Sequence, residues 1–434
     1  MCHEFSPGAA SELTPSIVAS VKKSPLKITI LGLHYAPEPS GNAPYTTSLA
    51  EGLAARGHTV RVLTGYPHYP EWQLHTGYRG WSADEVINGI PVARLRHHIP
   101  RRPTGLTRLH MELSFGCRLV FARWGSPDVV LLVSPALFSS GLALARARFG
   151  LRRPAVGVWV QDLYSRGIVE TGGQAGLLSR LAAQLEGKIL GLATGVVAIH
   201  ERFARYIVDE LGVSADSVRV VRNWTHLPDI PVGDRSETRQ RLGWGQDEII
   251  VLHSGNMGKK QGLTNVVEAA KSAHATGSPT RFVLMGDGNQ RPALMQAGRG
   301  VANLSFVDSL PQDEFQAALQ AADVLLVNEL PGVRDMSVPS KLTSYYSTGI
   351  PVIAATDEGS VTAEELKKSC GGLRVNAGDP IALVKAAEAL SRNRRQAAEL
   401  GANGLRFRHE TLSESTAIAL YDNFITSLAS SRDH

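Results

Sequence analysis

The feature that most constrains this fold is a regular alternation of buried strands and helices, which begins near residue 27 and restarts near residue 248. The segment 27–33, KITILGL, is a short apolar run typical of strands buried on both faces of a parallel sheet. A loop, a helix near 43–56 and a second strand at 58–64 follow it. This order makes a βαβ unit, which predicts parallel strands joined by right-handed crossovers.

The same alternation continues along the chain in two blocks, separated by a break at 223–235 that holds two prolines and no apolar period. The sequence therefore predicts an α/β protein with two Rossmann-like, doubly wound domains that face a central cleft. We expect a flexible leader at 1–24, an N-terminal domain at 25–224 and a C-terminal domain at 225–410. The last helix, within 411–434, is expected to return and pack on the first domain.

Composition narrows the class of protein. The 434 residues carry 45 Lys and Arg against 40 Asp and Glu, a net charge of +5 that suits anionic small molecules without indicating nucleic acid. The three cysteines are far apart, which excludes a disulfide framework and a structural zinc site. The longest apolar run, 129–145, is interrupted by Ser, Pro and Gly. These features predict a cytoplasmic protein without nucleic-acid partners, able to bind peripherally at the inner face of the plasma membrane.

Two loops that follow predicted strands have the composition of phosphate sites. Gly41 and Asn42 stand at the amino end of the first helix, where free N–H groups and the helix dipole favour an anion. The stronger signal is the loop 253–263, HSGNMGKKQGL, in which glycines and paired lysines precede a helix. Its candidate phosphate-binding residues are Ser254, Gly255, Asn256, Lys259 and Lys260. The loop is not a Walker motif, and no G-x-G-x-x-G is present, which disfavours a hydride-transfer enzyme.

Other strand ends add weaker candidates for the same ligand. Asp287 can place a carboxylate on a ligand hydroxyl, and the segment after 303–307 can offer backbone groups to a base. A proline at the start of the predicted helix near 339 makes another amide-rich, anion-facing end. The donor-side candidates from these loops are Gly286, Asp287, Asp308, Leu310, Val338, Pro339, Ser340 and Lys341.

Three motifs, in this order, resemble a known family. They are HYAPEPSGNAPYTTSLAEGLAARGHTVRVLTGYPHYPEW near the start, SGNMGKKQGL midway and VPSKLTSYYSTGIPVIA late in the chain. From residue 27 onward the chain resembles the GT-B glycosyltransferases of family 4 (group 1), in the branch of WcaI-like and WbuB-like enzymes that make exopolysaccharides and O-antigens.

The resemblance implies retaining transfer of a sugar from a UDP- or GDP-sugar to an acceptor hydroxyl, with no metal and no other cofactor. The C-terminal domain would then bind the nucleotide-sugar and the N-terminal domain the acceptor. Gly41, Gly255 and Lys260 match the family's glycine-loop and phosphate-lysine positions. The chain departs from the family at Asn256, where many relatives have arginine. It departs again at Met336 and Ser344, where a Glu-x7-Glu motif would place glutamates and the second would hold the ribose.

On the acceptor side, Asp162 follows a strand of the first domain, where relatives place a residue near the reacting hydroxyl. Asp162 and Lys260 are therefore the predicted catalytic residues, although an aspartate there can equally cap the next helix. An aromatic loop and an arginine-rich stretch suggest a polyprenyl-diphosphate-linked or saccharide acceptor and an anionic membrane surface, with a plain solvated face as the alternative. The residues on this side are Tyr66, His68, Arg101, Arg102 and Arg108.

Two other functions stay open from the sequence. A nucleotide-sugar epimerase can use the same fold, and the missing glutamates are compatible with a nucleotide-sugar-binding protein impaired in catalysis.

Overall fold

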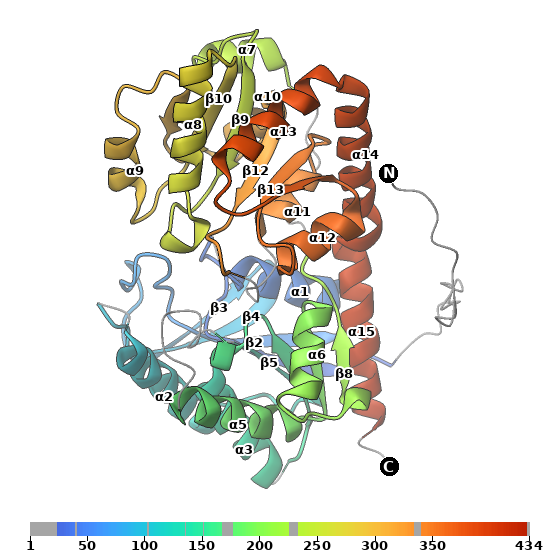
Figure 1. Ribbon diagram of the computed structural model, residues 1–434. Coiled ribbons are helices and arrows are strands. Elements are labelled where there is room, and N and C mark those ends of the chain that lie inside the picture. The colour runs from blue at the N-terminus through green and yellow to red at the C-terminus, as the bar shows by residue number, and fades with distance from the viewer. Residues whose placement is uncertain are drawn as a thin grey trace, which may run out of the picture.

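The computed structural model describes residues 24–39, 41–101, 104–134, 136–150, 152–166, 177–224, 233–333 and 340–431. It shows two α/β domains, one above the other, each built on a largely parallel sheet (Figure 1). This arrangement confirms the predicted fold class. The predicted leader lies outside the described residues except for its last one, and so does most of the break at 223–235.

The first sheet has eight strands in the order β3-β4-β2-β1-β5-β6-β7-β8 and is parallel except for the β3–β4 pair. Its strands are β1 (Lys27–Leu31), β2 (Thr59–Gly65), β3 (Ser82–Ile87), β4 (Ile90–Leu95), β5 (Val129–Val133), β6 (Ala155–Val160), β7 (Gly195–Ala198) and β8 (Val218–Val220). Its helices are α1 (Ala43–Ala55), α2 (Gly105–Phe121), α3 (Leu137–Phe149), α5 (Leu177–Gly191) and α6 (Glu201–Asp209). Every residue of β5, β6 and β7 is buried, as the apolar runs predict.

The second sheet has six strands, all parallel, in the order β11-β10-β9-β12-β13-β14. Its strands are β9 (Ile249–Ser254), β10 (Thr280–Met285), β11 (Leu304–Val307), β12 (Val324–Asn328), β13 (Val352–Ala355) and β14 (Gly372–Val375). Its helices are α7 (Arg235–Arg241), α8 (Thr264–Thr276), α9 (Arg291–Ala297), α10 (Gln312–Ala321), α11 (Ser340–Tyr346), α12 (Val361–Ser369), α13 (Pro380–Arg392) and α14 (Arg394–Thr411).

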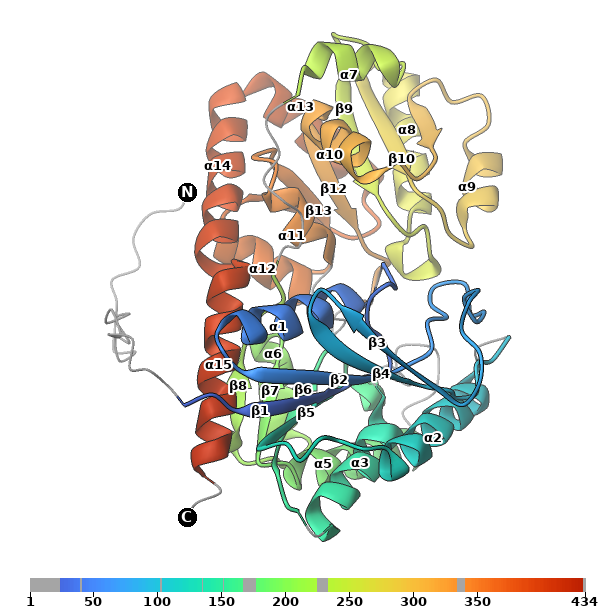
Figure 2. The same ribbon diagram turned by 180° about the vertical axis from the view of Figure 1, so that it is seen from behind.

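The last two helices lead the chain from the second domain back to the first. Helix α14 packs on α11 and α13, and α15 (Glu414–Ser430) continues downward along the first sheet (Figure 2). Phe424 and Leu428 of α15 fill the space above Gly157 and Gly195, where any Cβ would approach them within about 3 Å. Small residues on β6 and β7 thus let the helix lie close to the sheet and bury its apolar face.

Two features of the fold are absent from the sequence-based predictions. Strand β3 of the β3–β4 hairpin alternates exposed and partly buried residues, so it lacks the continuous apolar run that marks the other strands. Strand β4 is mostly buried, but exposed Pro91 interrupts it. Strand β14 is short and only partly buried, because it forms the edge of the second sheet. None of the described helices combines the length and hydrophobicity that a membrane span requires.

Candidate functional site

A cleft of about 1060 Å³ lies between the two sheets and is lined from both. The carboxyl ends of the parallel strands point toward it, as expected for ligand sites in doubly wound folds. Eight of the predicted site residues line this cleft: Gly41, Asn42, Arg108, Asp162, Gly255, Asn256, Lys260 and Lys341. They come from five separate stretches of the chain.

The loop after β9 is held open by close backbone contacts. The Gly255 N–H donates to the Met285 carbonyl at 2.8 Å, and Gly286 lies so close that a Cβ on it would be 2.4 Å from the Gly255 oxygen. Both glycines have positive φ, +102° and +120°. Met257 is fully buried and anchors the loop in the second core. A side chain at either glycine would not fit this backbone conformation. The loop therefore exposes backbone groups, and not side chains, to the cleft.

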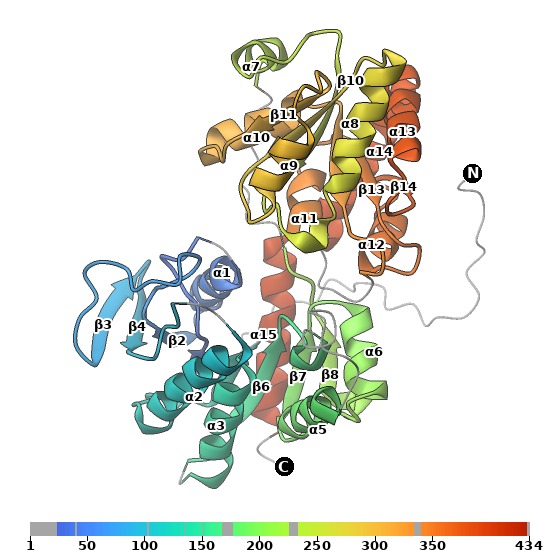
Figure 3. The ribbon, with the colours of Figure 1, turned by 60° about the vertical axis from the view of Figure 1, so that its left-hand side comes forward.

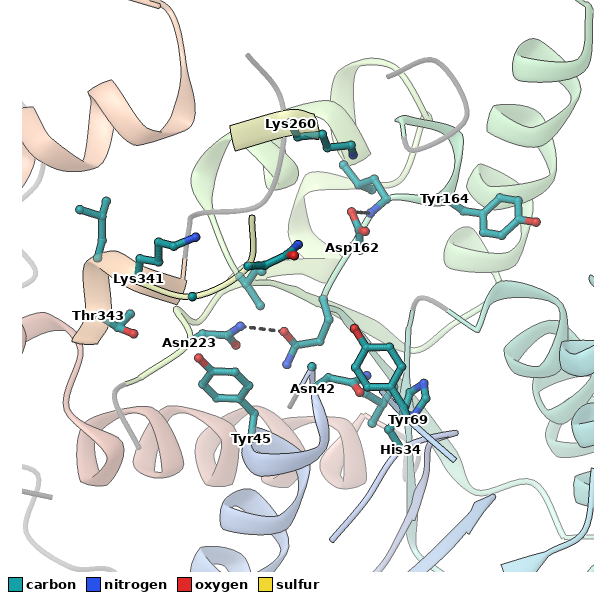
Figure 4. Close-up of a pocket in the computed structure, with 18 of the residues that line it drawn as sticks. His34, Asn42, Tyr45, Tyr69, Asp162, Tyr164, Asn223, Lys260, Lys341 and Thr343 are labelled. Carbon is teal, nitrogen blue, oxygen red and sulfur yellow. Dashed lines mark hydrogen bonds between the residues drawn. The ribbon is translucent and has the colours of Figure 1, made fainter. Parts of the chain in front are cut away.

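The two lysines of this loop differ in their environment. A short 3-10 turn, Lys259–Gln261, aims Lys260 into the cleft, opposite Asp162 of the first domain (Figure 4). Lys259 is exposed on the same turn and does not line the cleft. The Asn256 side chain lies against Gly258 of its own loop and against Gly288 of the loop after β10. It is uncharged, so it does not replace the arginine that the family resemblance leads us to expect at this position.

Lys341 enters the cleft from the first turn of α11. Its Cε and Nζ lie 3.4 and 3.7 Å from the position of a Cβ on Gly255, which places the amine over the glycine loop. Burial lowers the pKa of Lys341 to about 8, while the Glu329 carboxylate opposes the shift. Burial in turn raises the pKa of Glu329, whose oxygens accept from the hydroxyls of Thr356 and Thr362. An anion bound beside this amine would stabilise its charged form.

The first domain contributes the loop between β1 and α1. Gly41 has a φ of +69° and faces Tyr69, and Asn42 donates from Nδ2 to the Ser134 carbonyl at 3.4 Å. The Asn42 Oδ1 is buried without a hydrogen-bond partner. An unpartnered buried oxygen facing a cleft is a place where a ligand donor would be stabilised.

A buried carboxylate organises the neighbouring loop. Glu38 accepts from the backbone N–H groups of His68 and Tyr69 at 2.8 and 2.9 Å and from His34 Nδ1 at 2.7 Å. Burial alone would raise the pKa of Glu38, but these hydrogen bonds hold it below its usual value. His34 and Tyr69 reach the cleft as a result. His68, which was predicted on the acceptor side, is fully buried instead.

Asp162 stands at the end of β6, exposed to the cleft. Its Oδ1 accepts from the Leu163 N–H at 2.9 Å, and burial raises the pKa of its carboxyl against the opposing charge of Lys260. The neighbouring Gln161 accepts from Asn223 Nδ2 at 2.7 Å, the dashed contact in Figure 4. A second carboxyl, Glu112 of α2, lines the same part of the cleft, and burial raises its pKa to about 7.

The two domains touch beside the cleft through polar side chains. Tyr45 of α1 is hydrogen-bonded to Thr343 of α11. Glu365 of α12 accepts from Arg222 at 2.6 Å and contacts His200 at 3.1 Å. Burial opposes ionisation of Glu365, but these partners lower its pKa. We call His200, Arg222 and Glu365 the clamp, because they join the two domains at the back of the cleft.

Two groups among the described residues have the geometry to hold a metal ion. They are His34, Glu38 and His68, and His200, Glu201 and Glu365. The sequence analysis missed both because one member of each group, His68 or Glu365, is distant in the chain from the other two. In each group a carboxylate already accepts hydrogen bonds from protein groups. Glu38 holds the loop that contains His68, and Glu365 joins the two domains.

The remaining donor-side predictions lie away from the cleft lining. Ser254 bonds Tyr345 within the core, Asp287 bonds the N–H of Gly288, and exposed Asp308 pairs with Arg291. Leu310 packs on the hydrophobic cluster that covers the opposite face of the second sheet from Met257. Ser344 is not among the residues that line the cleft, although it follows Lys341 by about one turn of α11. The Ser340 backbone begins α11, whereas Arg102, Val338, Pro339 and Met336 lie outside the described residues.

On the acceptor side, only Arg108 reaches the cleft, where its guanidinium lies 5.2 Å from the centre of the Trp72 ring. Tyr66 is buried and donates to the Arg79 carbonyl, and Arg101 is exposed beside a separate shallow pocket. Sequence reasoning missed Glu112 and Tyr164, which face this side. One signal was available: Glu112 is the single acidic residue between 101 and 127.

Comparison with known proteins places this cleft in a family. Residues 40–224 match the Glycosyl transferase 4-like domain, and residues 248–393 match Glycosyl transferases group 1. The putative colanic acid biosynthesis glycosyl transferase WcaI of Escherichia coli is 32% identical over 339 residues, 75% of this chain and 82% of WcaI. The D-inositol 3-phosphate glycosyltransferase of Acidothermus cellulolyticus is 28% identical over 86% of this chain and 84% of its own.

Solved structures agree on the fold. HepE of Anabaena in complex with UDP superposes with a TM-score of 0.70 at 14% identity, covering 93% of this chain and all of HepE.

Proposed function

Because the chain belongs to the group 1 glycosyltransferases of the GT-B fold, in the branch of WcaI, we propose that it moves a sugar from a UDP- or GDP-sugar to a hydroxyl. The acceptor in this proposal is lipid-linked or a saccharide in cell-envelope or exopolysaccharide synthesis. Transfer proceeds with retention of anomeric configuration and without a metal ion.

One observation carries the proposal: the glycine loop, Lys260 and Lys341 converge on the cleft from the second domain. A nucleotide diphosphate needs N–H donors and compact positive charge, and these residues supply both. Gly41 and Asn42 approach from the first domain and can contact the sugar or its phosphate. HepE, which shares the fold, has been solved with UDP and with UDP-glucose, and this supports a nucleotide-sugar donor here.

The proposed chemistry breaks the bond between the anomeric carbon and the diphosphate and forms a bond from that carbon to the acceptor oxygen. Negative charge develops on the departing diphosphate, where Lys260 and Lys341 stabilise it in place of a divalent cation. The acceptor hydroxyl loses a proton as it attacks. Asp162, with its raised pKa, is placed to orient that hydroxyl and take the proton.

The acceptor approaches from the first-domain side of the cleft, where Arg108, Glu112 and Tyr164 are found. A guanidinium there suits the phosphates of a polyprenyl-diphosphate-linked sugar, and a carboxyl and a phenol suit sugar hydroxyls. The Tyr45–Thr343 contact and the Glu365 clamp leave this side open while joining the domains at the back.

The test is a transfer assay with UDP- and GDP-sugars, lipid-linked and soluble acceptors, and mass spectrometry of the products, in the presence and absence of EDTA. We expect an acceptor gaining one sugar, undiminished by EDTA, with the donor's anomeric configuration preserved in the NMR spectrum of the product. Conversion of the donor sugar without acceptor would instead indicate an epimerase. Nucleotide-sugar binding without turnover of any acceptor would indicate a protein impaired in catalysis.

A further inference from the structure

One buried carboxylate of the first domain has no part in the proposed chemistry. Glu186 belongs to helix α5, which packs beside α3 and lies away from the second domain (Figure 3). It is 1% exposed and does not line the cleft. Burying a carboxylate is costly unless hydrogen-bond donors or a cation compensate it, so the partners of this side chain indicate its role.

The partners of Glu186 are donors on a single turn of the chain. Its Oε1 accepts from the Tyr164 N–H at 2.8 Å, and its Oε2 accepts from the Ser165 N–H at 3.0 Å and from the Ser165 hydroxyl at 2.5 Å. Residues 164–166 are helical, so the two N–H groups belong to a first helical turn, where backbone donors lack partners within the helix. Burial raises the pKa of Glu186, and the hydrogen bonds from Ser165 and Tyr164 oppose the shift. Glu186 therefore caps this turn from a different helix.

The capped turn directly follows the carboxylate that we propose as proton acceptor. Asp162 and Tyr164 are two residues apart after β6, and their side chains point away from each other (Figure 4). Leu163 between them is 1% exposed. On the other side, the Ser134 hydroxyl donates to the Asp162 carbonyl at 3.3 Å. The backbone that carries the Asp162 side chain is thus held from both directions, by Ser134 and by Glu186.

Glu186 also acts on Asp162 through its charge. After burial and the opposing hydrogen bonds, the charge of Asp162 is a further cause that raises the pKa of Glu186. Repulsion between two carboxylates is mutual, so an ionised Glu186 makes Asp162 a stronger base. Burial raises the pKa of Asp162 as well, and the charge of Lys260 across the cleft opposes that shift. A proton acceptor needs a fixed place and sufficient basicity, and Glu186 favours both.

We propose that Glu186 is a positioning residue for sugar transfer, which fixes the turn after β6 so that the Asp162 carboxylate meets the acceptor hydroxyl. This role rests on the proposed function, because Glu186 acts only through Asp162. It does not line the cleft and so does not contact the donor or the acceptor. A displacement of about 1 Å at a reacting group can cost about 10²-fold in rate, and loss of the cap should therefore be visible in kcat.

The test is the variant Glu186→Gln, which keeps the shape of the side chain and removes its charge. One side of the amide is an NH₂ group, which cannot accept from the donors of the turn. We expect kcat for sugar transfer to fall about 10- to 10²-fold, while the Kd for the nucleotide-sugar stays within about twofold by calorimetry. The acid limb of the pH profile of kcat/KM should move to lower pH, because Asp162 loses a neighbouring negative charge.

A second variant separates the place of Asp162 from its basicity. Ser165→Ala removes one donor to Glu186 and keeps the charge. It should lower kcat about fivefold, the effect of one hydrogen bond, and leave the pH profile unmoved. If Glu186→Gln does not fold, Ser165→Ala decides: a fall in kcat at unchanged nucleotide-sugar affinity supports the proposal, and an unchanged kcat overturns it.

The matched control for loss of stability is Asp323→Asn. Asp323 also accepts from a backbone N–H, that of Ile250 at 2.8 Å, but it precedes β12 and does not line the cleft. The control should lower the urea midpoint and leave kcat within about twofold. The double variant Asp162→Asn/Glu186→Gln should be no slower than Asp162→Asn alone, because Glu186 acts through Asp162.

The positioning role is overturned if Glu186→Gln keeps the wild-type kcat or the wild-type pH profile, or if Asp323→Asn loses as much activity. An additive loss in the double variant also overturns it, since Glu186 would then act independently of Asp162. A wild type that transfers no sugar to any acceptor would refute the proposed function, and the positioning role with it. Transfer that requires Asp162 and not Glu186 would refute the positioning role alone.

Discussion

The pKa of Lys341 makes donor affinity depend on pH in a calculable way. With a pKa of about 8, the amine of the empty protein is about nine-tenths protonated at pH 7 and about one-tenth protonated at pH 9. If the diphosphate binds only to the charged amine, the apparent Kd for a nucleotide-sugar rises about tenfold between these two pH values, or about 1.4 kcal/mol. The diphosphate diester of a nucleotide-sugar does not itself titrate in this range.

The assay is isothermal calorimetry with the nucleotide-sugar that binds best, for the wild type and Lys341→Met. The variant keeps the length of the side chain and removes the charge, so its affinity should be lower at pH 7 and its pH dependence should be lost. Any ionisation of the base affects both proteins equally and cancels in the comparison. An equal tenfold loss in Lys341→Met, or no loss in the wild type, would refute the placement of Lys341 at the diphosphate.

Loss of the proton from Lys341 affects the stability of the fold in the opposite direction to donor affinity. Between pH 8 and the unfolded pKa near 10.5, the unfolded chain binds more protons than the native protein, so the contribution of Lys341 to stability rises with pH. Donor affinity falls over the same interval. General alkaline damage would lower both, and measuring the free energy of unfolding of the empty protein at each pH therefore separates the two causes.

Three further predictions follow from the packing and the site. Gly286→Ala should cost about 3 kcal/mol in urea unfolding and weaken donor binding, because its Cβ would meet the Gly255 oxygen, whereas Gly359→Ala, with open space around it, should change little. Asp162→Asn should lower kcat by about 10²-fold and leave nucleotide affinity within about twofold, as measured by initial rates and calorimetry. Phe424→Ala should destabilise the protein by about 3 kcal/mol in denaturant unfolding, since α15 loses its contact with β6 and β7.

Much of the fold could be predicted from sequence because the core strands are continuous apolar runs between loops. The prediction failed for β3 and β14, which lie at sheet edges and are at most partly buried, and for β4, whose buried run is interrupted by exposed Pro91. At an edge, one side of the strand faces solvent and the apolar signal weakens.

Only part of the site could be predicted from the sequence. Strand ends and glycines identified the loops, but the direction of each side chain depends on local geometry. One residue along a 3-10 turn separates Lys260 in the cleft from exposed Lys259. Ser344 follows Lys341 by about one turn of α11, yet the shorter serine side chain is not part of the cleft lining. The sequence around His68 predicts an exposed loop residue. In the structure its backbone N–H donates to the carboxylate of Glu38, thirty positions earlier, and its side chain is buried.

The contacts within the clamp at the back of the cleft could not be predicted from the sequence. Its members, His200, Arg222 and Glu365, are far apart in the chain and meet only because α12 packs beside α6. Such contacts between domains depend on tertiary arrangement, which neither composition nor periodicity encodes.

The central claim is that Lys260, aimed into the cleft opposite Asp162, stabilises the departing diphosphate during sugar transfer. The most direct measurement compares kcat/KM for sugar transfer in Lys260→Ala with that in Lys259→Ala, the adjacent exposed lysine on the same turn. We predict a loss of about 10²- to 10³-fold for Lys260→Ala and a change of less than about twofold for Lys259→Ala. Equal rates in the two variants, or a larger loss in Lys259→Ala, would contradict the account.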